Sequence, residues 1–210
     1  MFAPGAGRMI GPPALVALFL ALVLAFGSLS GVAVGGLALA LALALALSGF
    51  FAIFFRDPER TPGAGIVSAA DGRVRAIETV EGRLRISVFM NVTDVHVNRL
   101  PLDATVTEIA EGGTGFRAAY LPAAEHNVRR HYRLGTALGP VEVVQITGVL
   151  ARRLVSFVRP GHAGRKGERF GMIVLGSRVD VLLPAARAEA VVAVGDRVRA
   201  GETPIARERP

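Results

Sequence analysis

The sequence predicts a mainly β (α+β) soluble domain preceded by an N-terminal hydrophobic helical hairpin. Residues 13–55 hold no charged side chain, whereas residues 56–210 consist of short β-branched runs separated by Gly, Pro and Asp. The chain has 210 residues, of which 51% are hydrophobic, and its mean hydropathy is +0.46. Because this average is high for a soluble domain, we expect part of the chain to lie in lipid. We therefore assign residues 1–55 to the hairpin and residues 56–210 to the β-rich domain.

The uncharged run of residues 13–55 is long enough for two membrane-spanning helices. One such helix needs about 20 apolar residues, and the Gly-Ser-Leu-Ser-Gly segment at residues 27–31 is a natural break. We predict helices at residues 10–26 and 32–54. A cleaved signal peptide is one alternative, because Arg8 precedes a short apolar run, but the second apolar run argues against it. Buried helices of a soluble protein are the other, and uninterrupted neutrality argues against them.

The charges that flank this run predict its orientation. Arg8 precedes the first helix, Arg56 and Arg60 follow the second, and the connecting loop is uncharged. The positive-inside rule then places both ends, and the domain that follows, on the cytoplasmic face of the inner cell membrane. Whether the hairpin spans the bilayer or lies partly in its interface stays open.

The remainder of the chain reads as strands with little helix. Residues 117–130 have some helical character, but Pro122 interrupts them. With 155 residues, this part is large enough to bury its own core. The predicted strands are residues 66–67, 74–80, 84–92, 104–109, 141–150, 154–158, 172–175, 179–183 and 191–194.

Composition and charge exclude several function classes. The chain has no cysteine, so disulfides, thiolate nucleophiles and cysteine-ligated metal centres are ruled out. The net charge is +7, and Lys166 is the only lysine among 24 basic residues. Arginine binds the phosphates of nucleic acids and of lipid headgroups equally well. With no Trp and only two Tyr, however, base-stacking surfaces are scarce, and we expect no nucleic-acid partner.

Four histidines are available, and none has the spacing of a zinc site. His126, His131 and His162 lie in polar or basic stretches and are interpreted as surface residues. His96 differs, because strand alternation over residues 89–101 puts Asp94, His96 and Asn98 on one face. Such a face is either exposed to solvent or one wall of a polar site, and the pattern alone does not decide between them.

Two short signals complete the candidates. Asp71-Gly72 is typical of a turn and most often has no further role. Gly176-Ser177 lies in the middle of an otherwise continuous strand pattern. A glycine there costs stability and marks a bulge or a close backbone approach.

Taken in order, five segments resemble one family, the phosphatidylserine decarboxylase proenzymes of the short prokaryotic type. The similarity extends from about residue 54 to residue 206. Each segment is weak alone, but the five in this order and spacing are specific. They are residues 54–60, 71–72, 94–99, 145–153 and 167–177.

The resemblance implies that the chain cleaves itself between Gly176 and Ser177. It would yield a β chain of residues 1–176 and an α chain of residues 177–210, with Ser177 converted to a pyruvoyl group. This covalent cofactor would form a Schiff base with the substrate amine and take up the electrons released with carbon dioxide. Neither pyridoxal phosphate nor a metal is then needed.

The resemblance also implies roles for individual residues. His96 would be the base, oriented by Asp71, in the logic of a serine–histidine–aspartate set. Longer relatives carry a second histidine where Arg99 stands here, which leaves open whether His96 serves self-cleavage, turnover or both. Arg152 and Arg153 would bind the lipid phosphate or else form structural ion pairs.

The implied activity is the decarboxylation of phosphatidylserine to phosphatidylethanolamine in phospholipid biosynthesis at the membrane. An ether-linked archaeal lipid would present the same headgroup, and a homo-oligomer is left open. The competing hypothesis is a membrane-anchored, non-enzymatic β-module, because residues 194–206 resemble a turn of lipoyl carriers and adaptor proteins. A carrier would present a lysine there, and this segment has none. A zinc endopeptidase is disfavoured by the missing His-x-His pair.

Overall fold

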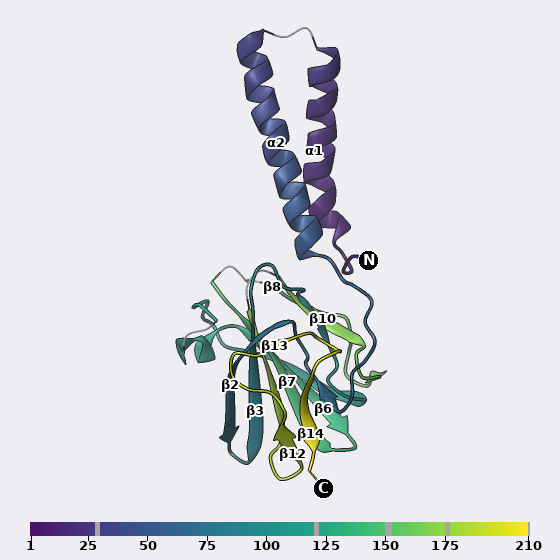
Figure 1. Ribbon diagram of the computed structural model, residues 1–210, viewed down its shortest axis with the longest axis vertical. Helices are drawn as coiled ribbons and strands as arrows, with labels where there is room; N and C mark the ends of the chain where they lie inside the picture. Colours follow the sequence, from purple (N-terminus) through teal and green to yellow (C-terminus); the bar gives the residue numbers. More distant parts are fainter. Residues whose placement is uncertain (28–29, 120–121, 150–152, 175–176, 210) are drawn as a thin grey trace. The chain divides into compact units, whose positions relative to one another are not determined.

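A computed structural model describes residues 1–27, 30–119, 122–149, 153–174 and 177–209. The chain divides into two compact units, Met1–Pro58 and Glu59–Pro210, and each is described by itself. The predicted fold class is confirmed, since two apolar helices precede a β-rich unit whose paired strands are all antiparallel (Figure 1).

The first unit is a pair of helices, α1 (Gly7–Phe26) and α2 (Gly31–Phe54). Both predicted helices are present, and α1 begins three residues earlier than expected. The start of the chain is bound to the end of α2 by backbone hydrogen bonds from Ala3 N–H to Phe55 C=O (2.8 Å) and from Asp57 N–H to Met1 C=O (2.9 Å).

Both helices are long and apolar enough to cross a membrane. Only 6% of the most apolar window of each is buried, unlike core helices of soluble proteins, which are mostly buried. Phe26 and Val32, which flank the break, are 85% and 90% exposed. Apolar surface of this extent favours association with lipid.

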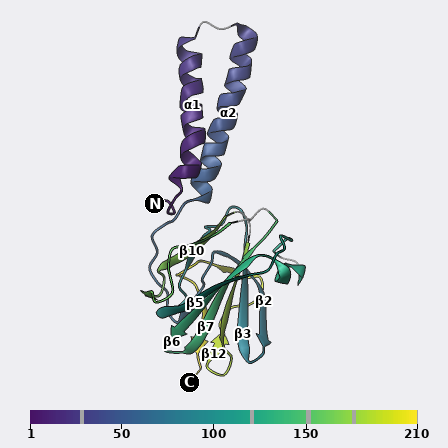
Figure 2. The same ribbon diagram turned by 180° about the vertical axis from the view of Figure 1, so that it is seen from behind.

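The second unit is built from three antiparallel sheets. The largest has the order β13-β2-β3-β11-β7-β6-β5-β9, and its middle strands can be followed from behind in Figure 2. The two smaller sheets have the orders β4-β10-β8 and β1-β14-β12. The bounds are β1 Ile66–Val67, β2 Gly72–Val80, β3 Arg83–Met90, β4 Val97–Arg99, β5 Ala104–Gly112, β6 Arg129–Thr136, β7 Gly139–Thr147, β8 Arg153–Ser156, β9 Ala163–Gly164, β10 Arg169–Val174, β11 Ser177–Pro184, β12 Ala188–Ala190, β13 Arg197–Val198 and β14 Pro204–Glu208; a short 3-10 helix, η1, covers Pro122–His126.

The core lies on one face of the large sheet. Along β11, Val179, Val181 and Leu183 are at most 1% exposed and pack into it. The alternating residues Arg178 and Asp180 lie on the opposite face, as strand geometry requires. β11 pairs along its length with β3 and over six residues with β7, so it is an interior strand.

Three predicted segments differ from the structure, because side chains bind the backbone locally. Residues 191–194 form a turn and no strand, since Ala193 N–H donates to the Asp196 carboxylate at 2.8 Å and Gly195 has a φ of +100°. Strand β12 lies just before this turn. Residues 117–130 are helical only over η1, because the Asn127 side chain binds the backbone N–H and C=O of Arg117 (2.8 and 2.7 Å).

The third difference concerns the strand predicted through residues 89–101. β3 ends at Met90, because the chain turns there: Asn91 N–H donates to the Asp94 carboxylate at 2.8 Å, and Asp94 N–H donates to Asn91 C=O at 2.9 Å. The strand resumes as β4 at Val97. Neither His96 nor Asn98 lies on a solvent face, since both are 0% exposed.

Candidate active site at the start of β11

Ser177 is the first residue of β11 and lies between the ends of two other strands. Its register partners are Met90 at the end of β3 and Thr147 at the end of β7. The side chain is completely buried, and its hydroxyl donates to the Met90 thioether sulfur over 3.3 Å. A thioether is a weak acceptor. The hydroxyl is therefore shielded from water, and its hydrogen bond within the described residues is a weak one.

His96 lies next to the strand that leads to Ser177. It directly precedes β4, which pairs with β10, and Ile173 N–H of β10 donates to the His96 carbonyl at 3.2 Å. Gly176 follows the end of β10 by two residues and lies outside the described residues. The bulge or close approach expected at this glycine therefore stays a prediction.

The hydrogen bonds of His96 indicate its tautomer. Its Nδ1 lies 2.8 Å from the carbonyl oxygen of Asp94, and the ring is buried. A carbonyl can only accept, so Nδ1 carries a hydrogen, and in the neutral ring Nε2 then carries the lone pair. The imidazole is thus arranged to accept a proton at Nε2.

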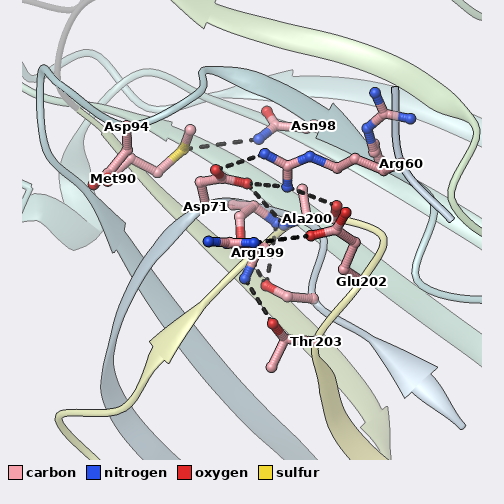
Figure 3. A network of polar contacts seen from close by, with 12 residues as sticks. Arg60, Asp71, Met90, Asp94, Asn98, Arg199, Ala200, Glu202 and Thr203 are labelled. Atoms are coloured by element: carbon pink, nitrogen blue, oxygen red, sulfur yellow. Dashed lines mark hydrogen bonds and ion pairs between the residues drawn. The ribbon is translucent and has the colours of Figure 1, made fainter. Parts of the chain in front are cut away.

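Asp71 lies in a bend directly before β2 and is held by other groups. Its two carboxylate oxygens accept from the two terminal nitrogens of Arg60 at 2.6 and 2.8 Å, and Ala200 N–H donates to it at 2.8 Å (Figure 3). A hydrogen bond to His96 is not among the contacts of Asp71 in the described part of the chain. The role of Asp71 in orienting His96 stays a prediction.

The Asp71-Gly72 turn nevertheless lies against the site. Strands β1 and β2 belong to different sheets, so this turn does not close a hairpin. Gly72 has a φ of +145°, and a Cβ there would lie 2.0 Å from Phe89 O and 3.3 Å from Met90 Cα. Only glycine lets the chain pass so close to the end of β3.

A buried polar chain extends away from the Met90 sulfur. Asn98 Nδ2 donates to this sulfur at 3.7 Å, Gln145 Nε2 donates to Asn98 Oδ1 at 2.7 Å, and the Tyr132 hydroxyl donates to Gln145 Oε1 at 3.2 Å. The Met90 and Asn98 contact is drawn in Figure 3. The sequence analysis placed Asn98 on a face that could line a polar site but assigned no role to Met90, Gln145 or Tyr132, although a glutamine inside an apolar strand is a detectable signal.

The remaining candidates lie elsewhere. Arg153 is exposed at the start of β8, where it is the register partner of Val174, and Arg152 lies outside the described residues. His131 and His162 contact Glu142 and Glu168, each at 2.7 Å. Within the described residues, no three His, Asp or Glu side chains form a group that could hold a metal ion.

The sequence profile of the phosphatidylserine decarboxylase family matches residues 47–206. The chain belongs to the phosphatidylserine decarboxylase family. The match covers β1 through most of β14, so the Ser177 site lies within the part shared with this family. The expected resemblance is confirmed.

Relatives of the phosphatidylserine decarboxylase family support this assignment over most of the chain. The phosphatidylserine decarboxylase proenzyme of Thermobifida fusca (strain YX) is 46% identical over 159 residues, which cover 75% of this chain and 73% of the relative. The phosphatidylserine decarboxylase proenzyme of Nitratidesulfovibrio vulgaris (strain Hildenborough) is 46% identical over 172 residues, which cover 77% of this chain and 79% of the relative. The "Putative archaetidylserine decarboxylase proenzyme" of Halobacterium salinarum is 43% identical over 200 residues, 93% of each chain.

Proposed function

We propose that this chain is a self-processing, pyruvoyl-dependent decarboxylase that acts on phosphatidylserine at a membrane. Cleavage between Gly176 and Ser177 would give chains 1–176 and 177–210. The observation that carries the proposal is the environment of Ser177, which is a fully buried hydroxyl on a weak acceptor at the first residue of an interior strand.

The surroundings of Ser177 support its role as a nucleophile. Burial excludes water, which would otherwise compete for the same carbonyl carbon. The thioether contact leaves the hydroxyl hydrogen weakly held, so its transfer to a base costs little. Ser177 Oγ would attack the carbonyl of residue 176, and the C–N bond would break in favour of an ester. Elimination would then remove the Cα proton of residue 177 and break the Cβ–Oγ bond, and residue 176 would leave as a carboxylate. The dehydroalanine that remains would rearrange to an imine, and water would supply the ketone oxygen as the nitrogen leaves as ammonia.

His96 is the proposed base. Its Nδ1–H is directed at Asp94 C=O, which leaves Nε2 to take the serine proton. The hydrogen bond from Ile173 to its carbonyl fixes the His96 backbone beside the strand that leads to residue 176. Asp71 is bound to Arg60 in the uncleaved chain, so its proposed role beside His96 requires this ion pair to rearrange.

The residues around Ser177 fit the implied pyruvoyl group. Such a group needs a serine at its position, shelter from water and a neutral hydrogen-bond donor, and Asn98 Nδ2 contacts the same sulfur as Ser177. When present, the group supplies an electrophilic carbonyl that takes up the electron pair released with carbon dioxide. Lys166 Nζ donates to Gly65 C=O on the surface, so the single lysine does not serve this site.

The substrate and its location follow from two further observations. Relatives named for phosphatidylserine and for archaetidylserine support a lipid with a serine headgroup. The apolar helices α1 and α2 support association with a membrane, and the flanking arginines favour the cytoplasmic face. Arg152 and Arg153 remain proposed ligands of the lipid phosphate.

The test is an intact mass spectrum of the purified full-length chain beside the Ser177→Ala variant. We expect the wild type to contain a fragment of residues 177–210 that is lighter by one ammonia than a free serine start. Ser177→Ala should remain one chain and should release no carbon dioxide from phosphatidylserine vesicles. Ser87→Ala, which removes a buried hydroxyl of β3 outside the site, is the control and should be cleaved. Cleavage of Ser177→Ala at this bond would contradict the proposal.

A further inference from the structure

We propose that Asn98 is a positioning residue for the group at position 177, and that Gln145 and Tyr132 fix the direction of its amide. This inference rests on the proposed function. It adds a hydrogen-bond donor, the Asn98 amide, that stabilises negative charge at the Ser177 oxygen. The side chains from Tyr132 through Gln145 to Asn98 orient this donor, and we call them the relay.

The relay is a continuous chain of buried groups. Met90, Asn98 and Gln145 are 0% exposed and Tyr132 is 1% exposed. β10 packs directly on it, since a Cβ at Gly171 would lie 3.0 Å from Gln145 Nε2 and 3.2 Å from the Tyr132 hydroxyl. Side chains packed this tightly have little freedom to rotate.

The Tyr132 hydroxyl is the first donor of this chain of hydrogen bonds. An amide oxygen can only accept, so the hydroxyl gives its hydrogen to Gln145 Oε1 at 3.2 Å. Burial raises the pKa of Tyr132, so the hydroxyl keeps this hydrogen.

The same direction continues to the site. Since Gln145 Oε1 accepts, its Nε2 is the end that faces Asn98, and it donates to Asn98 Oδ1 at 2.7 Å. The Asn98 amide cannot flip without losing this bond, so its Nδ2–H must face the Met90 sulfur. That sulfur is also the acceptor of the Ser177 hydroxyl.

This arrangement suits a site where charge develops. Among the described residues, the acceptor of the Asn98 N–H is the Met90 sulfur, a weak acceptor, at 3.7 Å. When Ser177 Oγ gives up its proton, a charged oxygen beside that sulfur is a much stronger acceptor, and the donor is already oriented. A neutral amide also avoids the cost of burying a charge.

The test measures self-cleavage of the full-length chain, synthesised with phosphatidylcholine vesicles, by intact mass over time. Asn98→Asp keeps the shape but removes the N–H donor, and we expect cleavage to slow by about 100-fold or more. Gln145→Glu, which can no longer donate to Asn98, should slow it by a smaller factor. Ser87→Ala is the control, because Ser87 is a buried polar side chain of β3 whose register partner on β11 is Asp180 and not Ser177. It should cleave at the wild-type rate.

The pH profile separates positioning from structural support. In Asn98→Asp, a protonated carboxyl at position 98 regains an O–H donor. The cleavage rate of this variant, divided by the wild-type rate at the same pH, should therefore rise as the pH falls from about 7 to about 5, where burial keeps a carboxyl protonated.

Near-UV circular dichroism verifies that each variant is folded. Folded Asn98→Asp and Gln145→Glu chains that cleave within about threefold of a cleaving wild type would overturn this inference alone, because about 100-fold is expected for a lost donor. An uncleaved wild type would overturn the proposed function as well.

Discussion

At the scale of single residues, Arg129 is a charged group that the fold holds at a cost. Its Nε donates to Asn127 C=O at 3.2 Å, while its buried Nη2 has no hydrogen-bond partner among the described residues. Burial lowers the pKa of Arg129, and the nearby Arg178 lowers it further. Its neighbour Arg130 differs, since it binds Glu111 and the carbonyl of Leu154.

Replacing Arg129 should therefore stabilise the protein. Arg129→Met keeps the aliphatic stem and removes the unsatisfied donor, which costs about 1–3 kcal/mol when buried. We expect the thermal midpoint to rise by about 2–4 °C for each kcal/mol. Differential scanning calorimetry of the uncleavable Ser177→Ala chain measures this, and Arg130→Met should instead lower the midpoint. A lower midpoint for Arg129→Met would contradict the prediction.

At the scale of elements, alternation predicted most of the longer strands, and the exceptions have local causes. β2 and β11 were predicted to within two residues of their observed bounds, because both are runs rich in apolar and β-branched residues bounded by glycine or proline. β6 was missed, since Tyr132 and Leu134 are its only buried side chains among charged neighbours. The turn at residues 91–94 was missed as well, since it depends on which backbone groups the Asp94 carboxylate reaches.

The site was predictable only in part for a similar reason. Ser177 and His96 were proposed from their motifs, and the structure shows that both are buried. The pairing of Asp71 with Arg60, and the relay from Tyr132 through Gln145 to Asn98, depend on strand register and on packing between sheets. Neither follows from spacing in the chain.

Gly72 is expected to be essential for the start of β2. A Cβ there would lie 2.0 Å from Phe89 O, a backbone atom that cannot move without disturbing β3. Gly72→Ala should lower the free energy of unfolding by about 2–4 kcal/mol in urea titrations. Gly82→Ala is the control, because Gly82 also has a positive φ but nothing within 4 Å, so it should cost only about 1 kcal/mol. Equal losses of unfolding free energy in Gly72→Ala and Gly82→Ala would contradict this prediction, because backbone strain alone would then explain the effect at Gly72.

The β6–β7 pair carries a pH-dependent contribution to stability. Contact with His131, followed by Arg83 and Arg133, lowers the pKa of Glu142. A carboxyl whose pKa is lowered in the folded state stabilises the fold at pH values above its ordinary pKa, about 4.3. This contribution to stability is lost as the pH falls below that value. Glu142→Gln should cost about 1 kcal/mol or less near pH 7. In urea titrations, the difference in the free energy of unfolding between Glu142→Gln and the parent chain should vanish near about pH 3. A difference that grows on acidification would contradict this assignment.

At the scale of the whole molecule, the proposed cleavage bond separates strands that pair with one another. Residues 177–210 contain β11, β12, β13 and β14. β11 pairs with β3 and β7, β13 pairs with β2, and β14 pairs with β1. Both products of cleavage would thus contribute strands to the same sheets, and we expect them to remain associated until the protein is denatured.

This interleaving changes the kinetics of refolding. Before cleavage, β11 finds its place between β3 and β7 by closing a loop within one chain, whose entropic cost does not depend on concentration. After cleavage, the same strand must return from solution, and refolding becomes second order. Recovery of the cleaved protein from urea should rise with protein concentration, while recovery of Ser177→Ala should not. A molecule that has made its prosthetic group would therefore persist by slow unfolding and not by ready refolding.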